Sequence, residues 1–209
     1  MNYGPLLFLG ILLTLASSWF GMVLMPNQQL GALQPNFNTN TGAIYPQPIP
    51  GEAAQGREVY RSMGCNYCHT QQVRPDGFGA DIQRGWGKRR SVARDYVYQK
   101  PVMLGSSRTG PDLTNIGERQ PSYDWHYTHL FNPQTTSMGS IMPPYAFLFR
   151  TQRIGPDGPS TNALKLTAEF APVPGWEVVP TPEATQLVEY LRSLKSSVDI
   201  PDMPLPKSE

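Results

Sequence analysis

The chain has 209 residues, with 17 basic and 16 acidic side chains and a formal net charge of +1. This balance argues against a nucleic-acid-binding protein and against a polybasic protein of the membrane surface. The charge is nevertheless unevenly placed, because no Lys, Arg, Asp, Glu or His occurs before Glu52. The chain therefore divides into an uncharged leader and a polar domain.

The leader begins with an apolar segment from Gly4 to Met25, "GPLLFLGILLTLASSWFGMVLM". As a helix it would reach about 33 Å, enough to cross a bilayer core. A cleaved signal peptide is the alternative, but the segment lacks a basic start, a short apolar region and a small-residue cleavage site. Trp19 near the far end suits an interfacial anchor. We therefore predict an uncleaved transmembrane anchor over residues 1–25.

Residues 26–51 form a second uncharged segment with five prolines and many Asn and Gln residues. This composition predicts an extended linker that either lies on a neighbouring protein or acts as a flexible tether. The rest of the chain predicts a single domain over residues 52–197, followed by a C-terminal tail over residues 198–209.

Two helices are expected at the two ends of this domain. Residues 51–64 contain good helix formers, with Gly56 and Tyr60 on one face. Residues 181–196 offer Thr181 as the N-cap, followed by Pro182 in the first turn. The second helix carries an apolar stripe of Leu187, Tyr190, Leu191 and Leu194. Prolines and glycines break the chain between these helices, so we expect long loops there.

The only two cysteines lie within "CNYCH", as Cys65 and Cys68, directly before His69. This C-x-x-C-H spacing is typical of a c-type haem, with two thioether bonds and the histidine as an axial ligand. A thioredoxin-like dithiol is disfavoured because no βαβ pattern surrounds the motif. A zinc site is disfavoured because only His126 and His129 remain to complete four ligands.

The opposite axial position of such a haem is usually filled by a thioether sulfur in electron-transfer cytochromes. Met142 is the preferred ligand, because Pro143 and Pro144 stiffen the loop that carries it. The alternatives are Met138, Met103 or a histidine. An iron with two protein ligands has no open position, so we expect an electron carrier without catalysis of its own.

The segment "RTGPDLTNIG", residues 108–117, resembles the loop of class I cytochromes c that orients the histidine ligand. The resemblance implies that the Pro111 carbonyl accepts a hydrogen bond from His69. It also implies that the two terminal helices cross. Arg108 either pairs with a haem propionate or is solvated.

Four blocks resemble the mono-haem subunit II, of the CcoO or FixO type, of cbb3-type cytochrome c oxidases. In chain order they are "GREVYRSMGCNYCHTQQVRP", "GSSRTGPDLTNIGER", "DWHYTHLFNP" and "MPPYAFL". The expected fold is therefore mainly α, with one N-terminal transmembrane helix and a class I-like cytochrome c domain with long loops.

The resemblance implies an electron relay from one covalent haem c to the haem b of a haem-copper catalytic subunit that reduces oxygen. It also implies a calcium ion near the loop of Gly105 and Ser106, at the interface with that subunit. The electron donor is expected to be a further cytochrome c subunit or a soluble cytochrome. The implied location is the bacterial inner membrane, with the haem domain on the periplasmic side.

Two alternative functions and two unmatched segments remain. If the chain is not an oxidase subunit, it is expected to be a free-standing anchored electron shuttle or the small cytochrome subunit of a nitric oxide reductase. Residues 84–94 are unusually basic, and either dock an acidic donor or haem propionates, or form a solvated loop or contact a neighbouring subunit. Residues 151–180 do not match the family pattern well.

Overall fold

The computed structural model describes residues 2–38, 42–105 and 107–205. The chain divides into two compact units, Met1–Pro46 with Ala93–Val97, and Gln47–Val92 with Tyr98–Glu209.

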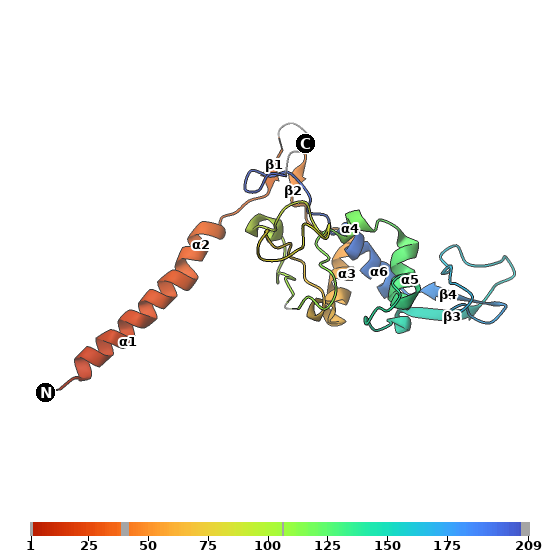
Figure 1. Ribbon diagram of the computed structural model, residues 1–209, viewed down its shortest axis with the longest axis horizontal. Coiled ribbons are helices and arrows are strands. Elements are labelled where there is room, and N and C mark those ends of the chain that lie inside the picture. Colours follow the sequence, from red (N-terminus) through yellow and green to blue (C-terminus); the bar gives the residue numbers. More distant parts are fainter. Residues whose placement is uncertain (1, 39–41, 106, 206–209) are drawn as a thin grey trace. The chain divides into compact units, whose positions relative to one another are not determined.

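The first unit begins with a long apolar helix (Figure 1). It consists of α1 (Gly4–Trp19), the π-helical turn η1 (Phe20–Leu24) and α2 (Met25–Leu30). The 27 residues of Gly4–Leu30 span about 40 Å and are apolar enough to cross a membrane. Pro26 does not end the helix, because it lies in the first turn of α2. The prediction of an extended linker from residue 26 is therefore wrong for residues 26–30.

A short hairpin completes the first unit. Strand β1 (Asn36–Phe37) pairs antiparallel with β2 (Ile44–Tyr45). The Tyr45 hydroxyl donates a hydrogen bond of 2.9 Å to Asp95, which lies in the 3-10 turn η3 (Ala93–Tyr96). The linker is thus partly ordered by pairing within its own unit.

In the second unit, α3 (Gly51–Ser62) and α6 (Pro182–Ser193) lie side by side (Figure 1). A Cβ atom at Gly56 would lie 1.8 Å from the Gln186 carbonyl oxygen, so only glycine allows this approach. The Tyr60 and Tyr190 rings meet edge to face, 5.3 Å apart between centroids. The predicted helix crossing is confirmed.

The core of this unit forms around the same pair of helices. All four apolar residues predicted for the last helix are buried, and Thr181 caps it by accepting a hydrogen bond from the Ala184 N–H. The remaining helical elements are short: η2 (Cys65–Tyr67), α4 (Ile116–Arg119), α5 (Tyr123–Phe131), η4 (Pro133–Thr135) and η5 (Ala146–Leu148). The second unit is therefore mostly helix and loop, as expected.

A hairpin that the sequence analysis did not predict follows η5. Strand β3 (Phe149–Arg153) pairs antiparallel with β4 (Trp176–Pro180), and the hairpin extends beyond α5 (Figure 1). Buried Glu177 accepts hydrogen bonds from the Ser160 N–H at 2.7 Å and from the Gln152 amide at 2.8 Å. These bonds order the loop between the strands, within the segment that lacked a clear family match.

Candidate functional site

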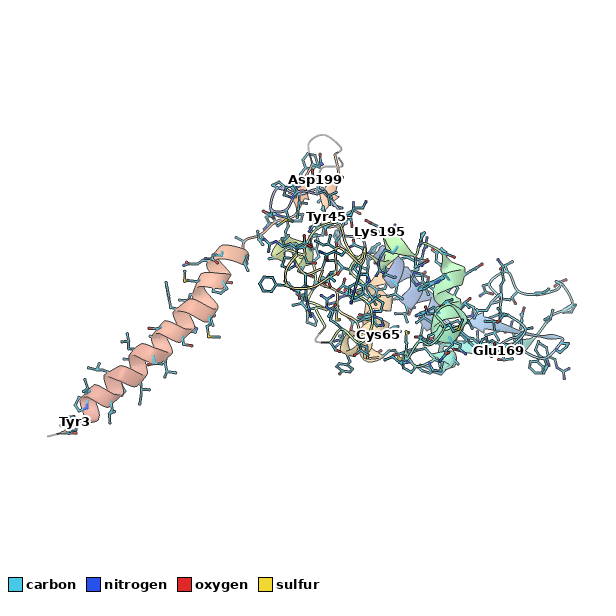
Figure 2. All side chains as sticks on the ribbon, viewed as in Figure 1. Tyr3, Tyr45, Cys65, Glu169, Lys195 and Asp199 are labelled. Carbon is cyan, nitrogen blue, oxygen red and sulfur yellow. The ribbon has the colours of Figure 1, made fainter. Side chains whose placement is uncertain are left out.

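The two cysteines lie on the turn that follows α3, at the edge of the domain where Figure 2 labels Cys65. Gly64, with φ +71°, ends the helix and starts this turn. The backbone then winds tightly, because the N–H groups of Cys68 and His69 both donate to the Cys65 carbonyl, at 3.2 and 2.9 Å. Both thiols are free and belong to the same short turn.

The environment of Cys65 does not suit a reactive thiolate. Burial raises the pKa of the Cys65 thiol to about 11. A thiol with a raised pKa is a weak nucleophile near neutral pH, which argues against the dithiol alternative.

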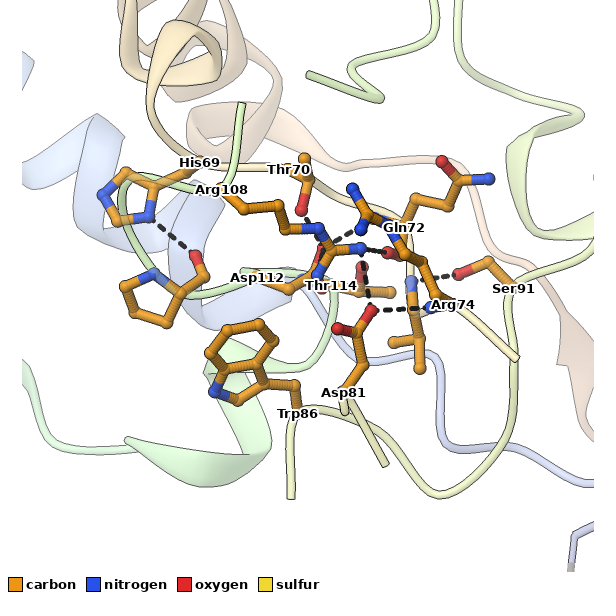
Figure 3. Close-up of polar contacts among 12 residues, drawn as sticks. His69, Thr70, Gln72, Arg74, Asp81, Trp86, Ser91, Arg108, Asp112 and Thr114 are labelled. Carbon is orange, nitrogen blue, oxygen red and sulfur yellow. Dashed lines mark hydrogen bonds and ion pairs between the residues drawn. The ribbon is translucent and has the colours of Figure 1, made fainter. Parts of the chain in front are cut away.

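His69 is held by its Nδ1 atom (Figure 3). Nδ1–H donates a 2.7 Å hydrogen bond to the Pro111 carbonyl oxygen, and a Cβ at Gly110 would lie 2.3 Å from the imidazole Cε1. Within the described part of the chain, no hydrogen bond engages Nε2. Burial lowers the pKa of His69, which keeps the ring neutral near pH 7. A neutral, oriented imidazole with Nε2 unbonded is what a metal ligand requires.

The loop that carries Pro111 is bound to the segment after the cysteines. The Gly110 N–H donates to the Cys68 carbonyl at 2.9 Å, and the Leu113 N–H donates to the Thr70 carbonyl at 2.8 Å. Asp112 is fully buried beside them. Asp112 was not predicted to be a site residue from the sequence. The one feature that could have indicated it is its position directly after Pro111.

Arg108 lies on the same network and is not solvated. Its side chain is 16% exposed, Nη2 lies 2.7 Å from Asp81 Oδ2, and Nη2 also donates to the Gln72 carbonyl at 2.7 Å. The guanidinium carbon lies 5.7 Å from the centre of the Trp86 ring. Nε and Nη1 are buried and form no hydrogen bond with the residues that the structure describes. Two nitrogen atoms of Arg108, Nε and Nη1, therefore remain available as hydrogen-bond donors.

Met142 is half-buried and packs against the same apolar cluster as Cys65 and Tyr145. Of the two alternative methionines, Met138 is 97% exposed, whereas Met103 is 3% exposed inside the core. Among these three methionines, Met142 alone is both accessible and packed against this cluster. The loop is joined to the end of α5 by the Tyr145 N–H, which donates to the Leu130 carbonyl at 2.8 Å.

The remaining histidines are engaged by neighbouring side chains and backbone. His126 is buried and its Nε2 lies 2.8 Å from the Gln120 carbonyl oxygen. His129 Nδ1 lies 2.5 Å from the Thr136 hydroxyl, and its ring stacks on Trp125. Burial lowers the pKa of each histidine to about 4. Across residues 2–38, 42–105 and 107–205, no group of three or more His, Cys, Asp or Glu side chains could hold a metal ion.

The basic segment is not uniform. Arg84, Lys88 and Arg90 are exposed, whereas Arg89 is buried and its Nε donates to the Val198 carbonyl at 2.9 Å. Arg94, in the first unit, donates to the Gln34 carbonyl. A wholly solvated loop is therefore wrong for Arg89.

The loop of Gly105 and Ser106 can be described only at Gly105, because Ser106 lies outside the described residues. Gly105 has φ +76°, and a Cβ there would lie 2.5 Å from the His69 carbonyl oxygen. Glycine is therefore required where this loop meets the cysteine motif.

These residues fit a haem. Cys65 and Cys68 supply two thiols on one turn, His69 offers an unbonded Nε2, and half-buried apolar side chains such as Met142 adjoin them. A half-buried apolar face is the surface that a large apolar ring would cover. A thiol pair, an imidazole and a thioether are also the ligand types of c-type cytochromes.

Comparison with known proteins supports this assignment. No curated protein matches the chain at a significant level. The model of the family described as "Cytochrome C oxidase, mono-heme subunit/FixO" matches residues 29–168, about two thirds of the chain. The match includes the cysteine motif, the Pro111 loop and Met142. The chain therefore belongs to the FixO family and is a mono-haem cytochrome c subunit of a cytochrome oxidase.

Proposed function

We propose that the chain holds one covalent haem c and relays electrons to the haem b of a haem-copper catalytic subunit, in a cbb3-type oxidase that reduces oxygen to water. Cys65 and Cys68 would form the two thioether bonds, and His69 Nε2 and Met142 Sδ would bind the iron. The observation that carries the proposal is the orientation of His69. Its Nδ1 hydrogen-bonds to the Pro111 carbonyl, whereas its Nε2 has no hydrogen bond among the described residues, and the two cysteines just before it in the chain are free.

Each residue has a distinct task in this proposal. When bound, the haem supplies a one-electron Fe(III)/Fe(II) couple. Pro111 fixes the tautomer of His69, because its carbonyl oxygen accepts a hydrogen bond from Nδ1–H. Met142 would be the second protein ligand of the iron, and an iron held by two protein ligands would have no open position for oxygen. A soft thioether ligand also raises the potential relative to a second imidazole.

Arg108 is the proposed partner of a haem propionate. Its Nη2 is committed to Asp81 and to the Gln72 carbonyl, but its buried Nε and Nη1 groups lack acceptors among the described residues. A buried N–H without a partner costs free energy, so an added carboxylate acceptor would be favoured.

The apolar helix is proposed to anchor the subunit and pack against the catalytic subunit. No residue of Gly4–Leu30 is buried within the chain, and Figure 2 shows the side chains of this helix projecting outward. The haem domain would then lie on the periplasmic side of a bacterial inner membrane. By family resemblance, a calcium ion would lie at the interface with the catalytic subunit. A further cytochrome c subunit or a soluble cytochrome would supply electrons.

The test is purification through a tag on this chain in a mild detergent. A c-type and a b-type band in the reduced-minus-oxidised spectrum, with cyanide-sensitive oxygen uptake, are expected. A c-type spectrum alone, obtained from intact membranes, would favour the free-standing shuttle. Nitric oxide consumption without oxygen uptake would favour the small cytochrome subunit of a nitric oxide reductase.

A further inference from the structure

One buried carboxylate, in the loop that carries Pro111, has no role in the electron-transfer proposal. Asp112 is 0% exposed and accepts three hydrogen bonds (Figure 3). Oδ2 accepts from the Thr70 hydroxyl at 2.6 Å and from the Gln72 N–H at 2.8 Å. Oδ1 accepts from the Thr114 N–H at 2.9 Å. A buried carboxylate is tolerated only with such partners, so its position is tightly determined.

These bonds join two segments that are far apart in the chain. Thr70 directly follows His69, and Asp112 directly follows Pro111, 42 positions after Thr70. The backbone bond from Leu113 to Thr70 joins the same two segments. This junction therefore helps to keep the Pro111 carbonyl oxygen 2.7 Å from His69 Nδ1.

We propose that Asp112 is a positioning residue that sets the Pro111–His69 hydrogen bond and, through it, the reduction potential of the haem. The inference rests on the proposed function, since it requires the iron to be bound to His69 Nε2. A strong bond from Nδ1–H makes the imidazole a better electron donor to the metal. Better donation favours Fe(III), so weakening the Asp112 junction raises the midpoint potential.

The charge of Asp112 would act in the same direction, and the test must separate the two effects. A nearby anion also favours Fe(III), and Arg108 Nη1 lies 4.0 Å from Asp112 Oδ2. Asp81 supplies the control, because it is a second buried anion that pairs with Arg108. Among the described residues, no hydrogen bond or ion pair joins Asp81 to Pro111, Asp112 or Thr70.

The experiment is a potentiometric titration of the c-type absorbance band in the full purified complex. Thr70→Val removes one hydrogen bond to Asp112 without changing charge, and we expect the reduction equilibrium to shift about threefold toward Fe(II). That shift equals about +28 mV at 59 mV per tenfold change. Asp112→Asn should shift it about tenfold, or about +59 mV. Thr70→Ser keeps the hydroxyl and should restore the wild-type potential.

The result that would overturn the inference is an unchanged potential in Thr70→Val together with equal shifts in Asp112→Asn and Asp81→Asn. That pattern would assign the effect to charge alone. If Asp112→Asn does not accumulate, the comparison of Thr70→Val with Thr70→Ser decides whether Asp112 affects the potential.

A haem stain of each denatured sample comes before the titration. A wild-type chain without covalent haem refutes the proposed function itself, whereas stained chains with unshifted potentials refute only the role of Asp112.

Discussion

The two sides that would flank the haem differ in how firmly the polypeptide holds them. On the His69 side, backbone bonds and the buried Asp112 carboxylate join the cysteine motif to the Pro111 loop. On the other side, the proposed ligand Met142 is half-buried, and Met138 nearby in the sequence is almost fully exposed. We infer that the protein positions the imidazole in advance, whereas haem binding completes the placement of the thioether.

The largest effect should come from removing the two cysteines that are proposed to attach the haem. In the double variant Cys65→Ala/Cys68→Ala, no thioether can form, so we expect complete loss of covalent haem. The measurement is a haem stain after denaturing electrophoresis. Each single variant keeps one thiol and serves as the control, with staining retained in part. A stained double variant would contradict covalent attachment through this motif.

Removing the proposed ligand Met142 should change the haem without releasing it. We expect Met142→Ala to keep covalent haem but to alter the oxidised spectrum. Its midpoint potential should fall by a sizeable part of the roughly 0.8 V that axial ligands control. Met138→Ala is the matched control, since Met138 is exposed and its loss should leave both readouts unchanged. An unchanged oxidised spectrum in Met142→Ala would refute this ligand assignment.

A single methyl group should disturb the firmly held side. A Cβ at Gly110 would overlap the His69 ring, at 2.3 Å from Cε1 and 2.7 Å from Nδ1. We expect Gly110→Ala to destabilise the domain by about 3 kcal/mol through overpacking. Urea unfolding measures this, with Gly155→Ala as the control, because a Cβ there would meet nothing within 4 Å. Equal stabilities of the two variants would show that the His69 ring is free to move.

The smallest expected effect is a dependence of the free energy of unfolding on pH, caused by His126 in α5. The pKa of buried His126 is lowered to about 4, so the unfolded state binds more protons between pH 4 and 6.5. Stability is therefore complete above pH 6.5 and is lost as the pH falls toward 4. From pH 7.5 to 5 we expect His126 alone to contribute a loss of about 2 kcal/mol.

Urea unfolding at the two pH values measures this loss. His126→Gln cannot titrate but keeps a donor for the Gln120 carbonyl, so the pH dependence should shrink by about the same amount. A variant that retains the full pH dependence would show that other groups cause it.

Much of the fold was predictable because its signals are local. The apolar segment, the Thr181 cap and the stripe on α6 depend on residues a few positions apart. The β3–β4 hairpin was not predictable in this way, because its order depends on Glu177 binding Ser160, 17 positions away in the chain. The helix beyond Pro26 was missed because proline is usually a boundary, yet the first turn of α2 accommodates it.

In the candidate site, the sequence by itself determined the chemistry: two thiols and an imidazole with the spacing of a haem attachment motif. Such spacing is local, and it needs only one turn of chain. Tertiary structure alone decided the surroundings, including the pairing of Arg108 with Asp81 and the three bonds to Asp112. These contacts join segments tens of residues apart, and burial makes them specific, because a buried charge must find its partners wherever the fold places them.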